Sequence, residues 1–282
     1  MSDLSTVRLI AAEFAGTTVV MLGGPGLMVL GGGSIGTLEA ALGFGLAMAI
    51  AMGVIGAVAN PMFSLALYLA RQITPREAVS DWIGQFLGAI FGAALIFGIN
   101  DTERLPSAAN GWDRNGFGEL GSVLAAELVL SVVVVVVLLS AVSQRMSTSA
   151  VAAFTGATYG LAMLLLVGID GGGINPARSL GSAIFADTDP NALGQVWAFI
   201  LVPLIGAFGG LMLWLLIDDA SIDDTVFDDV TDCPVLSASD GAAAHLRQTV
   251  RGVFAGLRSP CRRRPAWRQL PSPACRPRRP RW

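Results

Sequence analysis

Six long apolar runs constrain the fold of this 282-residue chain more than any other feature. They cover residues 9–30, 38–58, 79–99, 120–142, 149–169 and 193–217. Each run is close to the ~20 residues that a helix needs to cross a bilayer. Only 14% of the residues are charged, whereas soluble domains carry about 25%. Because a helix satisfies its own backbone polar groups in lipid, the sequence predicts an all-α membrane protein with six transmembrane helices.

Two Asn-Pro pairs, Asn60-Pro61 and Asn175-Pro176, interrupt this apolar sequence, and a short helical pattern follows each, at 63–68 and 179–186. Proline is tolerated at the first position of a helix, and asparagine is a good N-cap. A break in the backbone at membrane depth is tolerated only where protein buries it or water lines it. The pairs therefore predict two re-entrant half-helices and a pore or substrate path beside them.

The apolar core is a duplication. Ala12-Glu13-Phe14 matches Ala126-Glu127-Leu128, with the glutamates 114 positions apart, and the two Asn-Pro pairs lie 115 positions apart. Since each half holds three spans, an odd number, the second half is inverted relative to the first. We expect inverted repeats at about 8–100 and 119–217, with the half-helices meeting tip to tip near the bilayer midplane.

The chemistry at this meeting point favours neutral solutes. Both half-helix N-termini would place partial positive charge there, which repels cations and protons. The amides of Asn60 and Asn175 can exchange hydrogen bonds with water. Arg178 lies within the second re-entrant segment, where an arginine is costly and indicates a functional site. We interpret the path as a passive one.

Glu13 and Glu127 occupy matched positions within spanning segments. They are either proton-coupling carboxylates of a secondary transporter, a role that Asp170 would share, or acceptors that brace the irregular backbone of the two re-entrant loops. Two symmetric copies, one for each Asn-Pro loop, favour bracing.

Small residues recur at four-residue spacing on two spans, at Gly84, Gly88 and Gly92 and again at Gly206 and Gly210. Such faces allow helix backbones to approach closely in lipid. We expect them to pack helices and to say nothing about the solute.

Arginines set the predicted orientation, because the chain has no lysine. Four arginines lie in the N-terminal segment and in the loops after the second and fourth spans, and two lie in the loop after the third span. By the positive-inside rule this places both termini in the cytoplasm of a multi-pass protein of the cell membrane.

After Ile217 the composition changes, first to repeated aspartate and then to arginine and proline. Such a segment cannot bury a core, so we expect residues 218–282 to be a disordered cytoplasmic tail. The tail also holds all three cysteines and the sole histidine. The core therefore offers no cysteine or histidine for a metal site or for acid–base catalysis. We expect no enzyme activity, no metal, no cofactor and no nucleic-acid partner.

The motifs together resemble the major intrinsic protein family, the aquaporins and glycerol facilitators. The resemblance covers about residues 8–217 and rests on 12–17, 56–61 and 82–89, and most specifically on 173–179. It implies a homotetramer in membrane lipid, with one pore per subunit that conducts water or small neutral solutes passively.

The resemblance also implies the pore residues. The constriction would consist of Asn60, Pro61, Met62, Asn175, Pro176 and Ala177, with Met62 in place of the family's usual alanine. The selectivity filter would consist of Phe44, Met163, Gly172 and Arg178, with Ala40 as the alternative to Phe44. Met163 replaces the histidine of water-selective members, which predicts a wider and less polar filter.

Other positions conflict with a wide filter. Ser179 stands where glycerol facilitators have an aspartate, and Ala183 matches the water-channel pattern. The sequence thus leaves open a water channel, a facilitator of glycerol, ammonia or urea, and a closed family member occluded by Met62 and Met163.

Overall fold

The structure, a computed structural model, describes residues 3–100, 108–114, 116–218 and 225–227. These residues are helical or irregular and contain no strand. Six helical segments are long and apolar enough to cross a membrane: Ser5–Leu30, Thr37–Ile55, Pro75–Ile99, Leu120–Ser143, Thr148–Asp170 and Ala192–Ile217. The predicted six spans and the all-α class are confirmed.

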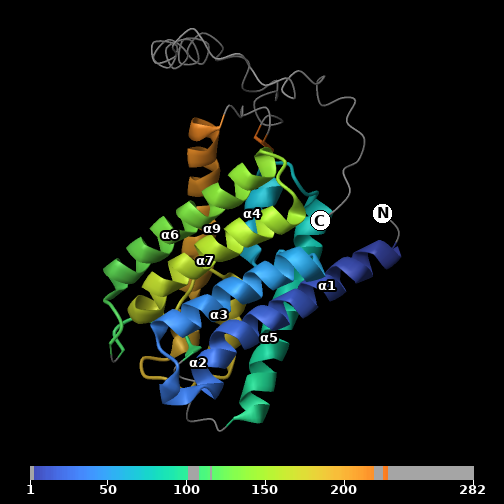
Figure 1. Ribbon diagram of the computed structural model, residues 1–282. Helices are drawn as coiled ribbons and strands as arrows, with labels where there is room; N and C mark the ends of the chain where they lie inside the picture. The colour runs from blue at the N-terminus through green and yellow to red at the C-terminus, as the bar shows by residue number, and fades with distance from the viewer. Residues whose placement is uncertain (1–2, 101–107, 115, 219–224, 228–282) are drawn as a thin grey trace, which may run out of the picture. The chain divides into compact units, whose positions relative to one another are not determined.

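Figure 1 shows the long helices packed side by side in one bundle. The spanning segments are not all simple α-helices. The first consists of α1 (Asp3–Met21), a π-helical turn η1 (Leu22–Gly26) and α2 (Leu27–Leu30), and a 3-10 turn η2 (Gly32–Ser34) follows. The second consists of α3 (Thr37–Ile50) and a π-helical turn η3 (Ala51–Ile55). The others are α5 (Pro75–Ile99), α6 (Leu120–Ser143), α7 (Thr148–Asp170) and α9 (Ala192–Ile217).

Each half of the chain packs its first spanning helix against its third, α1 on α5 and α6 on α9, while α3 and α7 join the halves. Glycines make these contacts close. A Cβ atom at Gly88 would lie 2.3 Å from the carbonyl oxygen of Phe14, and one at Gly206 would lie 2.3 Å from Cβ of Ser131. The helix-packing role predicted for these glycines is confirmed.

The half-helices α4 (Pro61–Leu69) and α8 (Pro176–Ile184) both pack against α5 and α9. In each, proline is the first helical residue and the preceding asparagine caps the helix. The side-chain oxygen of Asn60 accepts from the amide of Met62 at 3.0 Å, and that of Asn175 accepts from the amide of Arg178 at 3.2 Å. Both half-helices begin at the Asn-Pro pairs, as expected. Helix α4 ends one residue after the expected pattern at 63–68, and α8 ends two residues before the end of the expected pattern at 179–186.

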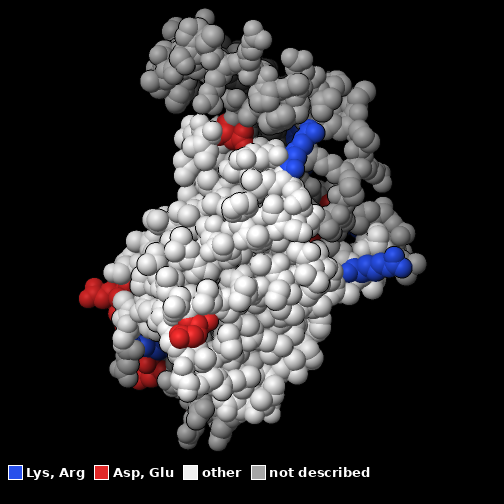
Figure 2. Space-filling view, in the orientation of Figure 1, with Lys and Arg blue, Asp and Glu red and all other residues white. Residues whose placement is uncertain are grey.

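The outside of the bundle is suited to lipid. On the face shown in Figure 2, most of the surface is uncharged, and only a few side chains on it are charged. Large apolar side chains such as Leu46 and Val54 are 63% and 81% exposed. Helix α9 ends at Ile217, where the predicted tail begins. The expected disorder of residues 218–282 falls almost entirely outside the described residues.

Candidate functional site

The two half-helices meet through their capping asparagines. Nδ2 of Asn60 donates to the carbonyl oxygen of Ile174 at 3.0 Å, and Nδ2 of Asn175 donates to the carbonyl oxygen of Ala59 at 2.9 Å. Ala59 and Ile174 both have left-handed backbones, with φ of 55° and 49°. This conformation lets the chain turn sharply into each half-helix. The reciprocal bonds hold the two helix N-termini together inside the bundle.

Each side-chain amide has two N–H donors. One donor of each asparagine makes the reciprocal bond described above, and neither side chain has any exposed surface. Each side chain therefore has a second N–H beyond the reciprocal bond, beside a helix N-terminus and in a buried environment.

Glu13 lies behind the first loop. Its carboxylate accepts from the amides of Val58 and Ala59 at 2.7 and 2.9 Å, and from Nε2 of Gln85 at 2.9 Å. Glu127 lies behind the second loop and accepts from the amide of Ile174 at 2.9 Å. Each carboxylate thus accepts hydrogen bonds from loop amides that have no carbonyl partner within a helix.

Arg178 is fully buried in the first turn of α8. Its Nη1 donates to Oδ1 of Asn110, and its Nη2 donates to the carbonyl oxygen of Gly171 at 2.7 Å. The guanidinium carbon lies 5.4 Å from the centre of the Phe44 ring. Within the described residues Nε has no hydrogen-bond partner. The arginine is therefore fixed in position but retains an unused donor.

Phe44, Met163 and Gly172 gather beside the arginine. A Cβ atom at Gly172 would lie 3.1 Å from Sδ of Met163 and 3.6 Å from Cε2 of Phe44. It would also lie 3.2 Å from Cγ2 of Val167, a neighbour that the sequence did not indicate. The backbone of Gly172 is left-handed, with φ of 82°, which favours glycine. The structure thus brings together all four residues expected at the filter.

The Phe44 ring can occupy its position because a glycine in the π-helical turn η1 leaves room for it. A Cβ atom at Gly24 would lie 2.2 Å from Cε1 of Phe44. The π-helical turn contains Pro25, which removes one backbone donor from the helix. Of the remaining constriction residues, Met62 is fully buried, and Ala177 packs against Met21 and Ala89.

The loop after α5 contributes a group that sequence analysis missed. Asn110 lies in the described part of this loop and is 3% exposed. Its Oδ1 accepts from Arg178, and its Nδ2 donates to the carbonyl oxygen of Asp170 at 3.3 Å. The neighbouring Gly111 donates its amide to the same carbonyl at 3.1 Å. Nothing in the local sequence distinguishes Asn110 from an ordinary loop asparagine.

Further hydrogen bonds of Trp112 and Arg114 hold the same loop in position. Trp112 receives a hydrogen bond from Nε2 of Gln195 at 3.2 Å and donates its amide to Oε1 of that side chain at 3.1 Å. Arg114 donates to the carbonyl oxygen of Ala109 and lies over the Phe117 ring, 4.9 Å from its centre. Partial burial lowers the pKa of Arg114. These bonds hold Asn110 against the arginine.

Asp170 adds a second buried carboxylate near Arg178. Its Oδ1 accepts from the amide of Gly172 at 2.8 Å, which stabilises the turn after α7. Acidic side chains here are too few for a typical metal site. Among the described residues no group of three or more His, Cys, Asp or Glu is placed to hold a metal ion.

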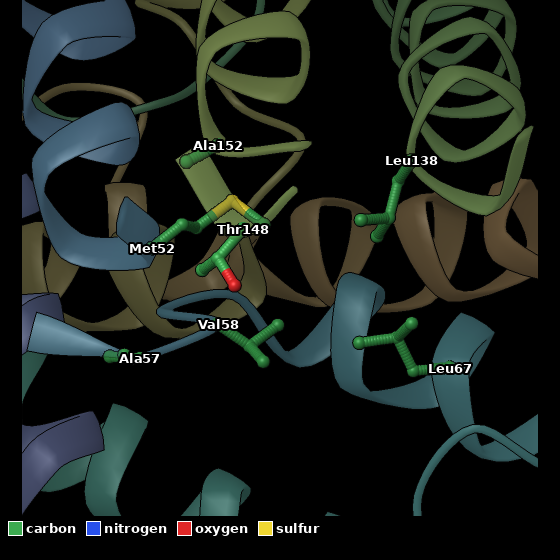
Figure 3. A pocket seen from close by; sticks show the side chains of 8 residues that line it. Met52, Ala57, Val58, Leu67, Leu138, Thr148 and Ala152 are labelled. Carbon is green, nitrogen blue, oxygen red and sulfur yellow. The ribbon is translucent and has the colours of Figure 1, made fainter. Parts of the chain in front are cut away.

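A small pocket opens beside the first loop, and Figure 3 shows side chains of this loop and of neighbouring helices around it. Its walls are mostly apolar, and the Thr148 hydroxyl is the one oxygen among the side chains drawn. The lining residues are Met52, Gly56, Ala57, Val58, Leu67, Leu138, Thr148 and Ala152. Since Gly56, Ala57 and Val58 line it, the pocket lies beside the loop that leads into α4.

Comparison with known proteins places this geometry in a family. The family model described as major intrinsic protein matches residues 1–214. Aquaporin Z of Brucella melitensis is 34% identical over 220 residues, which cover 73% of this chain and 95% of the relative. The glycerol uptake facilitator protein-like 6 of Lactiplantibacillus plantarum is 30% identical over 208 residues, which cover 71% of this chain and 94% of that protein.

A solved structure has the same fold. The aquaglyceroporin from Plasmodium falciparum superposes with a TM-score of 0.64 at 21% identity, covering 83% of this chain and 99% of its own. The family model, the relatives and the paired Asn-Pro half-helices agree. The chain belongs to the major intrinsic protein family.

Proposed function

We propose that residues 1–217 form a passive transmembrane channel for water and small neutral solutes, with no enzyme activity. One observation carries this proposal: Asn60 and Asn175 join two half-helix N-termini inside six membrane-spanning segments. Irregular backbone at this depth is tolerated where it is buried or lines a path. The similarity to Aquaporin Z and to a glycerol uptake facilitator supports the same function.

Exclusion of ions follows from the two N-termini. Their partial charges both face the meeting point, so a cation or a migrating proton is repelled there. A neutral molecule instead accepts hydrogen bonds from the side-chain amides of Asn60 and Asn175. Pro61, Met62, Pro176 and Ala177 form the remainder of this constriction in our proposal.

The selectivity filter in our proposal is Phe44, Met163, Gly172 and Arg178. The contact between the Phe44 ring and the guanidinium supports Phe44 rather than Ala40 as its aromatic member. Nε of Arg178 is buried and has no partner among the described residues, so in our proposal it is the donor left for a solute oxygen that enters the filter. Since Met163 and Gly172 offer no polar side chain, glycerol, ammonia and urea are the second candidate solutes.

Glu13 and Glu127 act as braces in this proposal. Their carboxylate oxygens accept two loop amides in the first half and one in the second. A proton-coupling carboxylate would have to release such bonds in each cycle, at a cost of about 1.5–3 kcal/mol for each bond to a charged group. This cost favours bracing over coupled transport.

The channel is proposed to be a homotetramer in the cell membrane, with both termini in the cytoplasm. The family relationship supports the assembly, and the exposed apolar side chains support contact with lipid or with another subunit. Native mass spectrometry in detergent tests the tetramer. Labelling of a cysteine introduced at Glu39 and of one at Gly116, in intact cells, tests the orientation.

Stopped-flow light scattering on proteoliposomes tests the function. An osmotic step reports water exit as shrinkage, and glycerol entry appears as re-swelling. Fast shrinkage with slow re-swelling identifies a water channel, and fast re-swelling identifies the wider alternative. Flux equal to that of protein-free liposomes contradicts the channel, and flux that vanishes when a pH gradient is collapsed identifies a coupled transporter.

A further inference from the structure

Tyr159 of α7 lies between the filter and the half-helices. Its side chain is fully buried. Its ring is edge-on to Phe44, with centroids 6.2 Å apart and planes at 63°, and edge-on to Phe63, also at 6.2 Å and at 76°. Phe44 contacts Arg178, and Phe63 belongs to the first turn of α4, directly after Met62. The three rings therefore form one continuous wall from the arginine to the meeting point of the half-helices.

The hydroxyl of Tyr159 is the polar end of this wall. It is buried and makes no hydrogen bond to any of the described residues. The nearby side-chain amide of Asn175 interacts with it as a hydrogen-bonding group, at a geometry too long or too bent for a formed bond, and the charge of Arg178 also acts on it. Buried hydroxyls almost always have a hydrogen-bond partner, supplied by protein or by an ordered small molecule. The unused hydroxyl thus marks a position where a polar molecule completes its bonding.

We propose that Tyr159 is a specificity-determining residue of the channel. Its hydroxyl hydrogen-bonds the permeating molecule on the wall that faces the asparagine pair, and its ring limits the size of that molecule. This inference rests on the proposed channel function and assigns to it a second point of selection, deeper than the arginine filter.

The hydroxyl matters because the rest of this wall is aromatic. A water molecule that accepts bonds from Asn60 and Asn175 still has two hydrogens to donate and gains a partner in the Tyr159 oxygen. The ring matters because packing here is tight: Asn60, Asn175 and Tyr159 all have no exposed surface, so even a water molecule needs the neighbouring side chains to shift slightly as it passes. A molecule larger than water would have to displace the ring, which Phe44 and Phe63 hold on both sides.

Two substitutions separate the hydroxyl from the ring. Tyr159→Phe keeps the wall and removes the hydrogen-bonding group, so water permeability should fall about fivefold, the effect of one lost neutral hydrogen bond. Tyr159→Val removes the ring, so the ratio of glycerol to water permeability should rise about tenfold or more, as for other changes of pocket size. Tyr68→Phe, at the only other tyrosine, is the matched control and should change neither quantity.

Permeabilities are measured by stopped flow on proteoliposomes with equal amounts of protein, after size-exclusion chromatography and thermal unfolding show that each variant is folded. The inference is overturned if Tyr159→Phe keeps the wild-type water permeability, or if a folded Tyr159→Val variant keeps the wild-type glycerol-to-water ratio. A wild-type protein without water flux would overturn the proposed function and this inference with it. Wild-type flux with unchanged variants would overturn only the inference.

Discussion

Replacing Glu13 with alanine tests how the first re-entrant loop is held. Glu13 is fully buried and accepts three hydrogen bonds, from the amides of Val58 and Ala59 and from Nε2 of Gln85, at 2.7–2.9 Å. Glu13→Ala removes both acceptor oxygens and with them all three hydrogen bonds. The loop has little room to move in and fill the space, because Ala57 already packs closely on α1 at Gly16, where a Cβ atom would lie 2.4 Å from Cβ of Ala57.

The expected loss of stability follows from the groups left without partners. An orphaned buried donor costs about 1–3 kcal/mol. Two orphaned backbone amides therefore destabilise the folded state by about 2–6 kcal/mol, a large part of the 5–15 kcal/mol typical of a whole domain. Glu13→Gln keeps one acceptor oxygen and places a donor against the other amide, so its effect should lie between that of alanine and the wild type.

The assay is thermal unfolding of the purified protein in detergent, followed by stopped-flow water permeability after reconstitution. Glu13→Ala should lower the unfolding midpoint and abolish most of the water flux, because Asn60 follows the loop that Glu13 holds. Glu39→Ala is the matched control, since Glu39 is an exposed glutamate in the first turn of α3. It should leave both measurements unchanged.

Bracing would be refuted by a Glu13→Ala protein with the wild-type unfolding midpoint and the wild-type water flux. A different result would point to proton coupling: normal stability, together with loss of a solute flux that a pH gradient drives in the wild type. The two roles are therefore separated by whether stability or coupling is lost.

Three further substitutions test the filter, the constriction and the helix packing, and a fourth is the control for the packing test. Arg178→Ala should admit larger solutes or ions while the oligomer stays intact in size-exclusion chromatography; unchanged solute selectivity would place the filter elsewhere. Asn175→Asp should add negative charge where the half-helices meet and raise cation leak, measured as dissipation of a potassium gradient; an unchanged leak would count against the barrier. Gly88→Ala should lower the unfolding midpoint, because its Cβ would lie 2.3 Å from the backbone oxygen of Phe14. Gly98→Ala on the same helix has open space around it and should be neutral or stabilising by up to ~1 kcal/mol; equal effects of the two changes would refute the packing argument.

The sequence alone was sufficient to predict the six spanning segments and the two half-helices. A bilayer requires helices of about 20 apolar residues and satisfies no backbone group itself. Both requirements concern consecutive residues, so a single apolar run of sequence is enough to predict a spanning helix. The Asn-Pro pairs are equally local, because proline and its capping asparagine determine where a helix begins.

Several contacts between side chains of different helices and loops could not be predicted from the sequence, and only the tertiary structure shows them. Asn110 contacts Arg178 although 68 positions separate them, and Tyr159 reaches Phe63 from another helix. The side chain of Phe44 lies beside Arg178 because Gly24, in a π-helical turn, leaves room for its ring.

The physical reason is that helix rotation and loop path are set by packing. A residue's distance from its own neighbours in the chain is fixed by helix geometry, whereas its contacts with other helices change with every turn or bulge. The repeat spacing therefore predicted that the asparagines meet. Which side chains surround them, and which donors remain unused there, depended on how α3, α7 and the loop after α5 pack around α8.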